Sequence, residues 1–283
     1  MDKELLRKVQ LLELMILEEV DRICKKYDLS YVLGYGTLIG AVRHSGFIPW
    51  DDDVDIFMPR ADYEKFLEVC PKELDEKFLL HYLKTDKNYP IAITKVRLKD
   101  TVFLQRADNR EMISEGIWID VFCLDKAKKK TSFSQRAKFS LVGAINTVKS
   151  IRQGWNPLKG SSLSIKLFYW MLRPFTVNAL YRMQECIKKG CSKKKAEYLV
   201  EYSGCYGQIK QTFSEKDLFP PQRIPFEGKD FCVPNNYHNV LCQIYGESYM
   251  TPPPVEKRVT HNPIRVDLGP YAEKSEDRNE VNG

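Results

Sequence analysis

Apolar residues recur at three- and four-residue intervals between Leu5 and Ile23, and this pattern predicts an amphipathic helix over residues 2–27. The same period predicts helices at 38–43, 60–69, 134–152, 163–183, 192–202 and 236–245. Pro71 is expected to end the helix at 60–69, and Pro174 to kink or end the helix at 163–183. Short apolar runs bounded by turn residues predict strands at 31–34, 53–58, 79–83, 91–98, 101–104 and 116–122, and a hairpin at 223–233 around Gly228.

This mixture of elements predicts an α/β (α+β) fold, in which helices flank a mixed sheet. We expect a core over residues 1–125, an inserted basic and aromatic-rich helical region at 126–202, and a C-terminal part at 203–271. Within the last part, residues 249–261 contain three consecutive prolines and are expected to be extended or polyproline-like. The polar residues 272–283 are expected to be disordered.

Composition narrows the class of protein. The chain has 283 residues, of which 43% are hydrophobic, so it can bury a real core. The charged N-terminus and the absence of any run near twenty apolar residues predict neither a signal peptide nor a membrane span, and hence a cytoplasmic protein. The eight cysteines form no Cys-x-x-Cys pair, so we expect buried reduced thiols, and the cysteine spacing offers no zinc site.

The net charge of +6 conceals a strong asymmetry. Residues 126–195 carry 13 Lys and 4 Arg against the single acid Glu185, a balance of +16, which leaves about −10 for the rest of the chain. The basic region and the acidic motifs are therefore different parts of the molecule.

Four aspartates among residues 51–55 are the strongest chemical feature of the chain. In the strand that follows, Asp53 and Asp55 point to one face because side chains alternate. Such a cluster suits a hard divalent cation. Three interpretations stay open: a solvated acidic turn, a calcium loop, and a catalytic Mg²⁺ or Mn²⁺ site. The calcium loop requires Gly sixth and usually Glu twelfth, where this chain has Ile56 and Asp62.

The residues before the aspartates favour a catalytic metal site. Gly36 and Thr37 follow a predicted strand and open a helix, so that free N–H groups and a hydroxyl can bind phosphate. A third carboxylate, Asp120, lies alone in the apolar run 116–122. This combination resembles the nucleotidyltransferase signature.

Three longer motifs narrow the resemblance: GTLIGAVRHSGFIPWDDDVDIFMPRADYEKF, WIDVFCLD and YGESYMTPPPVEKR. Together they resemble the LicD family, whose bacterial members transfer phosphocholine or related phospho-alcohols onto glycans and which is related to fukutin-type ribitol-phosphate transferases. The likeness implies a nucleotidyltransferase-like sheet with metal held by Asp51, Asp53, Asp55 and Asp120, of which Asp53, Asp55 and Asp120 would be catalytic. It also implies that the C-terminal segment closes over the site, where Arg258 and His261 would contact substrate.

Other side chains are expected to contact the donor. Gly36 and Thr37 would bind its phosphates, and Trp50 would pack against the base or sugar. Lys95 and Arg97 lie on one face of a predicted strand, either neutralising a pyrophosphate or facing solvent on an edge strand. Arg43 and His44 would contact phosphate or the attacking hydroxyl, or His44 would cap its own helix.

The resemblance predicts a metal-dependent phosphotransferase, with CDP-choline as the best donor and a hydroxyl of a cell-surface glycan or teichoic acid precursor as acceptor. The alternatives are a phosphoglycerol, phosphoribitol or sugar-phosphate donor, a nucleotidyltransferase, and a non-catalytic metal-binding interaction protein. Aromatic residues among the basic charges of 163–183, including Lys166, Arg173 and Arg182, suggest peripheral contact with the inner face of the cytoplasmic membrane, where a lipid-linked acceptor would lie. The alternative is a solvated helical surface, and nucleic acid is not an expected partner.

Overall fold

The computed structural model describes all residues except 87–88, 90–91, 108–109, 113–115, 155, 191–195, 259 and 273–283. The predicted polar tail therefore lies almost wholly outside the described residues, as do parts of the predicted strand at 91–98 and the predicted helix at 192–202.

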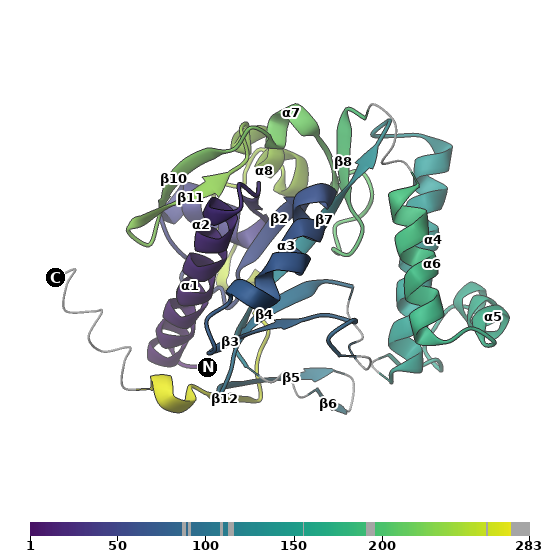
Figure 1. Cartoon of the computed structure of the whole chain (residues 1–283), viewed down its shortest axis with the longest axis horizontal. Coiled ribbons are helices and arrows are strands. Elements are labelled where there is room, and N and C mark those ends of the chain that lie inside the picture. The colour runs from purple at the N-terminus through teal and green to yellow at the C-terminus, as the bar shows by residue number, and fades with distance from the viewer. Residues whose placement is uncertain are drawn as a thin grey trace.

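A mixed sheet forms the centre of the molecule, as the sequence predicts (Figure 1). Its strands are β1 (Val32–Leu33), β2 (Asp55–Pro59), β3 (Phe78–His81), β4 (Thr94–Leu98), β7 (Trp118–Ala127), β8 (Tyr198–Glu201) and β9 (Thr212–Ser214). The main order is β1-β2-β7-β4-β3, and the far end of β7 pairs with β8, which pairs with β9. Only the β2–β7 pair is parallel among these strands, and all the other pairs are antiparallel.

Two smaller sheets flank the main one. The strands β5 (Val102–Ala107), β6 (Arg110–Met112) and β12 (Arg265–Asp267) form one of them. The other is the hairpin of β10 (Gln222–Phe226) and β11 (Lys229–Val233), which turns at Gly228 with φ of +75° and confirms the predicted hairpin.

Helices α1 (Lys3–Lys26) and α3 (Arg60–Glu73) pack side by side against the sheet (Figure 1). The side chain of Asp2 caps α1 by accepting the N–H of Leu5 at 2.8 Å, and the apolar stripe of α1 enters the core. The expectation that Pro71 ends α3 is wrong, because the helix continues to Glu73. Pro71 has no N–H, so the helix lacks one hydrogen bond in its last turn. The remaining helices of the core are α2 (Tyr35–His44), α7 (Glu215–Leu218), α8 (Tyr237–Tyr245), η1 (Val255–Lys257) and η2 (Gly269–Tyr271).

The basic region forms three helices at one end of the molecule: α4 (Phe133–Arg152), α5 (Leu163–Leu172) and α6 (Val177–Lys189) (Figure 1). Pro174 separates α5 from α6, so the predicted break at this residue is confirmed. Two small apolar clusters lie apart from the large core around the sheet. One is formed between the three helices, and the other lies where α4 packs against the ends of β7 and β8. In the part of the chain that the structure describes, no helix has both the length and the apolar composition to cross a bilayer.

The sheet extends further into this region than the sequence indicates. Strand β7 continues through Lys126 and Ala127, and β8 pairs with its last four residues. The helix predicted at 192–202 is therefore wrong for Tyr198–Glu201, which is a strand. Its last three side chains are buried between β7 and β9, where burial on a sheet outweighs local helix propensity.

Candidate active site

Three adjacent strands bring the central charges of the site to one level. Asp55, the first residue of β2, lies opposite Asp120 of β7, and Asp120 in turn lies opposite Lys95 of β4. Residues opposite each other on neighbouring strands point to the same face. The two carboxylates predicted from separate motifs are thus brought together by strand register.

Lys95 forms a buried ion pair with Asp120. The Lys95 Nζ lies 2.6 Å from the Asp120 Oδ1, and the indole N–H of Trp118 donates to the Asp120 Oδ2 at 3.3 Å. The Nζ also lies 4.0 Å from the centre of the Trp118 ring. Burial lowers the pKa of Lys95, while the Asp120 carboxylate opposes this shift.

Arg97 lies on the same face of β4, two residues further on, and is also buried. Its Nε donates to the Nδ1 of His81 at 2.7 Å, and one terminal nitrogen donates to the Gly116 carbonyl at 3.1 Å. The interpretation of Lys95 and Arg97 as solvent-facing charges on an edge strand is wrong, because β4 lies between β7 and β3.

The carboxylates near Asp55 form a crowded group. Burial, followed by the charge of Asp53, raises the pKa of both Asp51 and Asp55. Burial also raises the pKa of Asp53, and Asp120 adds to this effect while His261 opposes it. Carboxylates kept this close are stabilised by cations, protons or N–H donors.

A further carboxylate, Glu13 of α1, belongs to the same group and was missed by the sequence analysis. Its side chain is 2% exposed, and its Oε2 has no hydrogen-bond partner in the structure. Burial raises its pKa, and the charge of Asp53 is the next cause. The sequence contains one relevant sign, since Glu13 is the single polar residue between Leu11 and Leu17.

The turn before α2 fixes the start of β2. The Asp55 N–H donates to the Thr37 Oγ1 at 2.8 Å, and the Gly34 N–H donates to the Asp55 carbonyl at 2.8 Å. A β-carbon on Gly36 would lie 2.6 Å from an oxygen of Asp51, so any larger residue here would displace the Asp51 carboxylate. Tyr35, the first residue of α2, has φ of +37°, a strained value.

The C-terminal segment covers the acidic side of the site. The backbone N–H of His261 donates to both carboxylate oxygens of Asp52 at 3.1 Å, and its Nδ1 lies 2.9 Å from the Asp52 Oδ1. The Asp53 Oδ2 lies 3.8 Å from the His261 Nε2. Asp52, which the sequence did not single out, is thus the anchor of this segment. Within residues 249–261, regular structure is limited to η1 among the described positions.

Two other predicted contacts have partners within the chain. The Arg258 guanidinium lies 3.8 Å from the centre of the Trp50 ring, which leaves only one ring face for a base or sugar. Arg43 donates to the carbonyl of Tyr249 at 2.9 Å and to the Nε2 of His44 at 3.0 Å. Burial, followed by the charge of Arg43, lowers the pKa of His44.

Three neighbouring tyrosine rings, those of Tyr35, Tyr206 and Tyr245, lie beside the carboxylates and are called the tyrosine wall below. The Tyr206 ring centre lies 5.2 Å from that of Tyr35 and 5.5 Å from that of Tyr245. After burial and neighbouring groups, the charges of Asp55 and Asp53 contribute to the raised pKa of Tyr206. Behind this wall, the buried Glu201 carboxylate accepts the Tyr35 hydroxyl at 3.0 Å and the Gly204 N–H at 2.6 Å.

The acidic residues are of the type that binds a divalent metal. Asp53, Asp55 and Asp120 carry carboxylate oxygens, the ligands that Mg²⁺ prefers. Lys95 and the indole of Trp118 contact the two oxygens of Asp120. The raised pKa values of Asp53 and Asp55 show that the site favours added positive charge. A mixed sheet with these carboxylates on adjacent strands, next to a Gly-Thr helix start, defines a nucleotidyltransferase-like domain.

Comparison with known proteins agrees with this class. The model of the LicD/FKTN/FKRP nucleotidyltransferase domain matches residues 28–142. Over 268 residues the chain is 30% identical to the lipopolysaccharide cholinephosphotransferase LicD of Haemophilus influenzae, with 93% of this chain and 97% of that protein covered. An uncharacterized protein of Rickettsia typhi is 36% identical over 77 residues, which are 27% of this chain and 24% of that protein. The chain belongs to the LicD family and is a phosphotransferase of that family.

Proposed function

We propose that the enzyme transfers phosphocholine from CDP-choline to a hydroxyl of a cell-surface glycan, with Mg²⁺ or Mn²⁺ as cofactor. The observation that carries this proposal is the register that sets Asp55 opposite Asp120, with Asp53 in the same crowded group. The named Haemophilus relative is a lipopolysaccharide cholinephosphotransferase, which supports choline and a lipopolysaccharide-type acceptor over the other donors.

Asp53, Asp55 and Asp120 would hold the metal, with Asp51 as a further ligand or neighbour. Bound there, a divalent cation would neutralise the donor pyrophosphate and stabilise the charge on the leaving CMP. The acceptor oxygen attacks the phosphorus that carries choline, the bond from this phosphorus to the CMP oxygen breaks, and CMP leaves with the electron pair. Asp120, which is paired with Lys95, would accept the proton of the acceptor hydroxyl.

The remaining contacts would bind the donor. The free N–H groups at the start of α2, at Gly36 and Thr37, would face its phosphates. His261 and Arg43, with His44, would add positive charge or hydrogen bonds. Arg258 would support one face of the Trp50 ring, and the other face would pack against the base or sugar. The N–H groups of Lys95 and Arg97 already have partners in the chain. These two side chains would therefore position Asp120 and its neighbours and would not contact the donor directly.

The tyrosine wall supports a quaternary ammonium substrate. Aromatic faces attract such cations, and the Glu201 carboxylate lies behind the ring of Tyr35. We assign the trimethylammonium group to Tyr206 and Tyr245. Tyr206→Leu is expected to raise the KM for CDP-choline about tenfold, with little change in KM for CDP-glycerol. An equal change for both donors would contradict the assignment.

A lipid-linked acceptor would place the enzyme at the inner face of the cytoplasmic membrane. The helix α5 supports this location, because Leu163, Leu167 and Met171 are 73%, 63% and 61% exposed. Exposed basic residues, Arg173 and Arg182, lie close by in the sequence. Apolar side chains mixed with positive charge are typical of surfaces that dock on anionic lipid.

The test of the reaction is product analysis. The purified protein is mixed with CDP-choline, Mg²⁺ and a de-cholinylated lipopolysaccharide or teichoic acid precursor. We expect CMP and phosphocholine-modified glycan in equal amounts. Release of free phosphocholine, with CMP attached to the glycan, would instead indicate a nucleotidyltransferase. Turnover with CDP-ribitol or CDP-glycerol but not with CDP-choline would support the proposed type of reaction and would contradict CDP-choline as the donor.

A further inference from the structure

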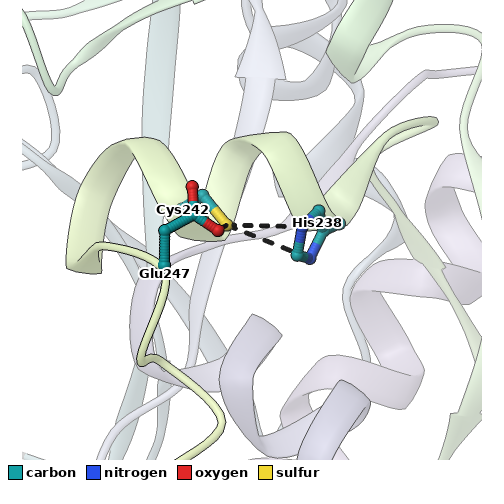
Figure 2. A group of neighbouring side chains, drawn as sticks. All are labelled: His238, Cys242 and Glu247. Atoms are coloured by element: carbon teal, nitrogen blue, oxygen red, sulfur yellow. Dashed lines mark hydrogen bonds between the residues drawn. The ribbon is translucent and has the colours of Figure 1, made fainter.

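Outside the acidic site, three side chains that commonly bind transition metals face one another (Figure 2). His238 and Cys242 lie on α8, and Glu247 follows two residues after the helix ends. The sequence predicts that the cysteines are buried, and this prediction is only partly met. Cys24 and Cys70 are buried, Cys242 is half-buried, and Cys186 and Cys205 are exposed.

Local structure explains why the three side chains meet. Residues four apart lie on the same side of a helix, which aligns His238 with Cys242. Gly246 then adopts φ of +91°, a value suited to glycine, and turns the chain back at the helix end. This turn brings Glu247 against the side of α8 that carries Cys242, as Figure 2 shows.

The distances match a tetrahedral zinc site. The Cys242 Sγ lies 3.5 Å from the His238 Nε2 and 3.5 Å from the Glu247 Oε2, and the three ligand atoms all lie within 4.8 Å of one another. Zinc bonds of about 2.3 Å to sulfur and about 2.0–2.1 Å to nitrogen or oxygen set tetrahedral ligands about 3.5 Å apart. The observed separations to sulfur therefore leave room for a zinc ion without rearrangement of the backbone.

A neighbouring side chain orients the histidine. The His238 Nδ1 lies 3.0 Å from the Tyr249 hydroxyl. The Nε2 is the ring nitrogen nearer to the Cys242 Sγ, at 3.5 Å against 3.9 Å for the Nδ1. Metal-bound histidines usually have their second ring nitrogen fixed in this way. Charge is also balanced, since one thiolate and one carboxylate neutralise Zn²⁺.

We propose that His238, Cys242 and Glu247 bind a zinc ion, with water as the fourth ligand. Binding releases the thiol proton of Cys242 to solvent. The ion would tie α8 to the start of the segment that carries Arg258 and His261. Tyr249 links this segment to α2 as well, because its carbonyl accepts a hydrogen bond from the Arg43 guanidinium at 2.9 Å. The proposal is independent of the donor and acceptor proposed above.

The first test uses the metal alone. The purified chain is stripped with a chelator, given excess Mg²⁺ to occupy the carboxylate site, and titrated with Co²⁺ and then Zn²⁺. We expect one equivalent of Co²⁺ to give a thiolate charge-transfer band and the intense visible bands of tetrahedral Co²⁺, both abolished by one equivalent of Zn²⁺. Cys242→Ser and His238→Ala are expected to lose the spectrum, and Glu247→Gln to weaken Zn²⁺ binding at least tenfold.

The matched control is Cys186→Ser, which removes an exposed thiol on α6. It should leave the spectrum unchanged. A second measurement needs no variant: Zn²⁺ should slow alkylation of Cys242 in the wild-type chain at least tenfold, as read by peptide mass spectrometry, while Cys186 and Cys205 react at unchanged rates. A Co²⁺ spectrum that survives Cys242→Ser, or alkylation of Cys242 unaffected by Zn²⁺, would overturn the proposal.

Discussion

Asp55 contributes to the site through both its backbone and its side chain. Its N–H and carbonyl bind Thr37 and Gly34, which fix the start of β2, while its carboxylate faces Asp120. Asp55→Asn keeps the backbone contacts and removes one of several crowded charges. We therefore expect Asp55→Asn, and likewise Asp53→Asn, to lose activity by at least ~10³ with unchanged or higher thermal stability.

The matched control for this prediction is Asp28→Asn. Asp28 is exposed and has φ of +53°, a conformation that asparagine also tolerates. Turnover and the melting temperature of this variant should match those of the wild type. Near-normal turnover in Asp55→Asn or Asp53→Asn would show that the metal ligands lie elsewhere.

The pair of Lys95 and Asp120 permits a sharper test at the same scale. Lys95→Met leaves a buried carboxylate without its cation, which is expected to cost about 3–5 kcal/mol of unfolding free energy. Adding Asp120→Asn should recover most of this loss, because the uncompensated charge is then removed. Asp120→Asn alone should lower turnover by at least ~10². Unfolding in urea would measure the stabilities.

A purely additive result in the double variant would mean that Lys95 and Asp120 do not interact energetically. Loss of folding without loss of specific activity in Asp120→Asn would identify Asp120 as a core residue.

Sequence reasoning located the carboxylates on β2 and β7 because a charge inside an apolar strand is a local pattern. It missed Asp52 and Glu13, whose importance depends on distant partners. The role of Asp52 depends on His261, which lies 209 residues away, and the role of Glu13 depends on the packing of α1 beside the acidic group. Neither contact can be recognised from the short repeats of apolar residues that predict helices and strands.

At the scale of elements, two cases show the same contrast: a prediction that rests on local sequence is correct, and one that depends on distant partners is not. The hairpin of β10 and β11 was predicted because its turn residue, Gly228, is local. The segment Tyr198–Glu201 was expected to be helical, although it pairs with both β7 and β9. The pairing of short strands depends on partners far along the chain, so composition alone did not identify β8.

Glu185, the single acid among residues 126–195, connects the basic helices to the core. The Glu185 Oε2 lies 2.7 Å from Arg60, which also forms a two-point contact with Asp125 of β7 at 2.8 and 2.7 Å. We expect Glu185→Gln to weaken this attachment by about 1–3 kcal/mol. Faster hydrogen exchange in α4 and α6, but not in α1, would measure it. Uniform exchange in all three helices would contradict this assignment.

Lys149 makes the stability of α4 and α6 depend on pH. Burial, followed by the charge of Lys188, lowers the pKa of Lys149 to about 7, although Glu185 opposes the shift. Below pH 7 the folded protein carries the cost of a buried charge. Between pH 7 and about 10.4 the unfolded chain binds more protons than the folded one, so stability rises with pH.

We expect Lys149→Met to be more stable than the wild type at pH 6.5, by an amount on the order of 2 kcal/mol, and to lose this advantage by pH 10. The difference would shrink because the wild-type lysine is then neutral. Thermal melts of both chains at each pH measure the difference, with the exposed Lys159→Met as control. A difference that is constant with pH would show that Lys149 is not buried as a charged group.

At the scale of the whole molecule, acidic and basic parts lie apart. The carboxylates of Asp55 and Asp120 belong to the central sheet, whereas α5 lies at the outer side of the basic helices (Figure 1). On α5 and the turn after it, Trp170 is 55% and Phe175 is 47% exposed, and the Arg173 guanidinium lies 4.9 Å from the Trp170 ring. An aromatic and cationic surface of this kind suits the interface of an anionic bilayer.

We therefore expect the protein to sediment with vesicles that contain anionic lipid, and to be released by salt. Each Lys or Arg near such a surface contributes about 1 kcal/mol, so charge reversal of Lys166, Arg173 and Arg182 to Glu should abolish binding. Reversal of three exposed lysines elsewhere changes the net charge equally and should leave binding intact; suitable positions are Lys3, Lys72 and Lys216. Activity on a soluble acceptor should survive both triple changes, because neither touches the carboxylates. Equal loss of binding in the two variants would mean that net charge alone attracts the protein, and equal sedimentation of the wild type with neutral and anionic vesicles would show that α5 does not recognise lipid charge.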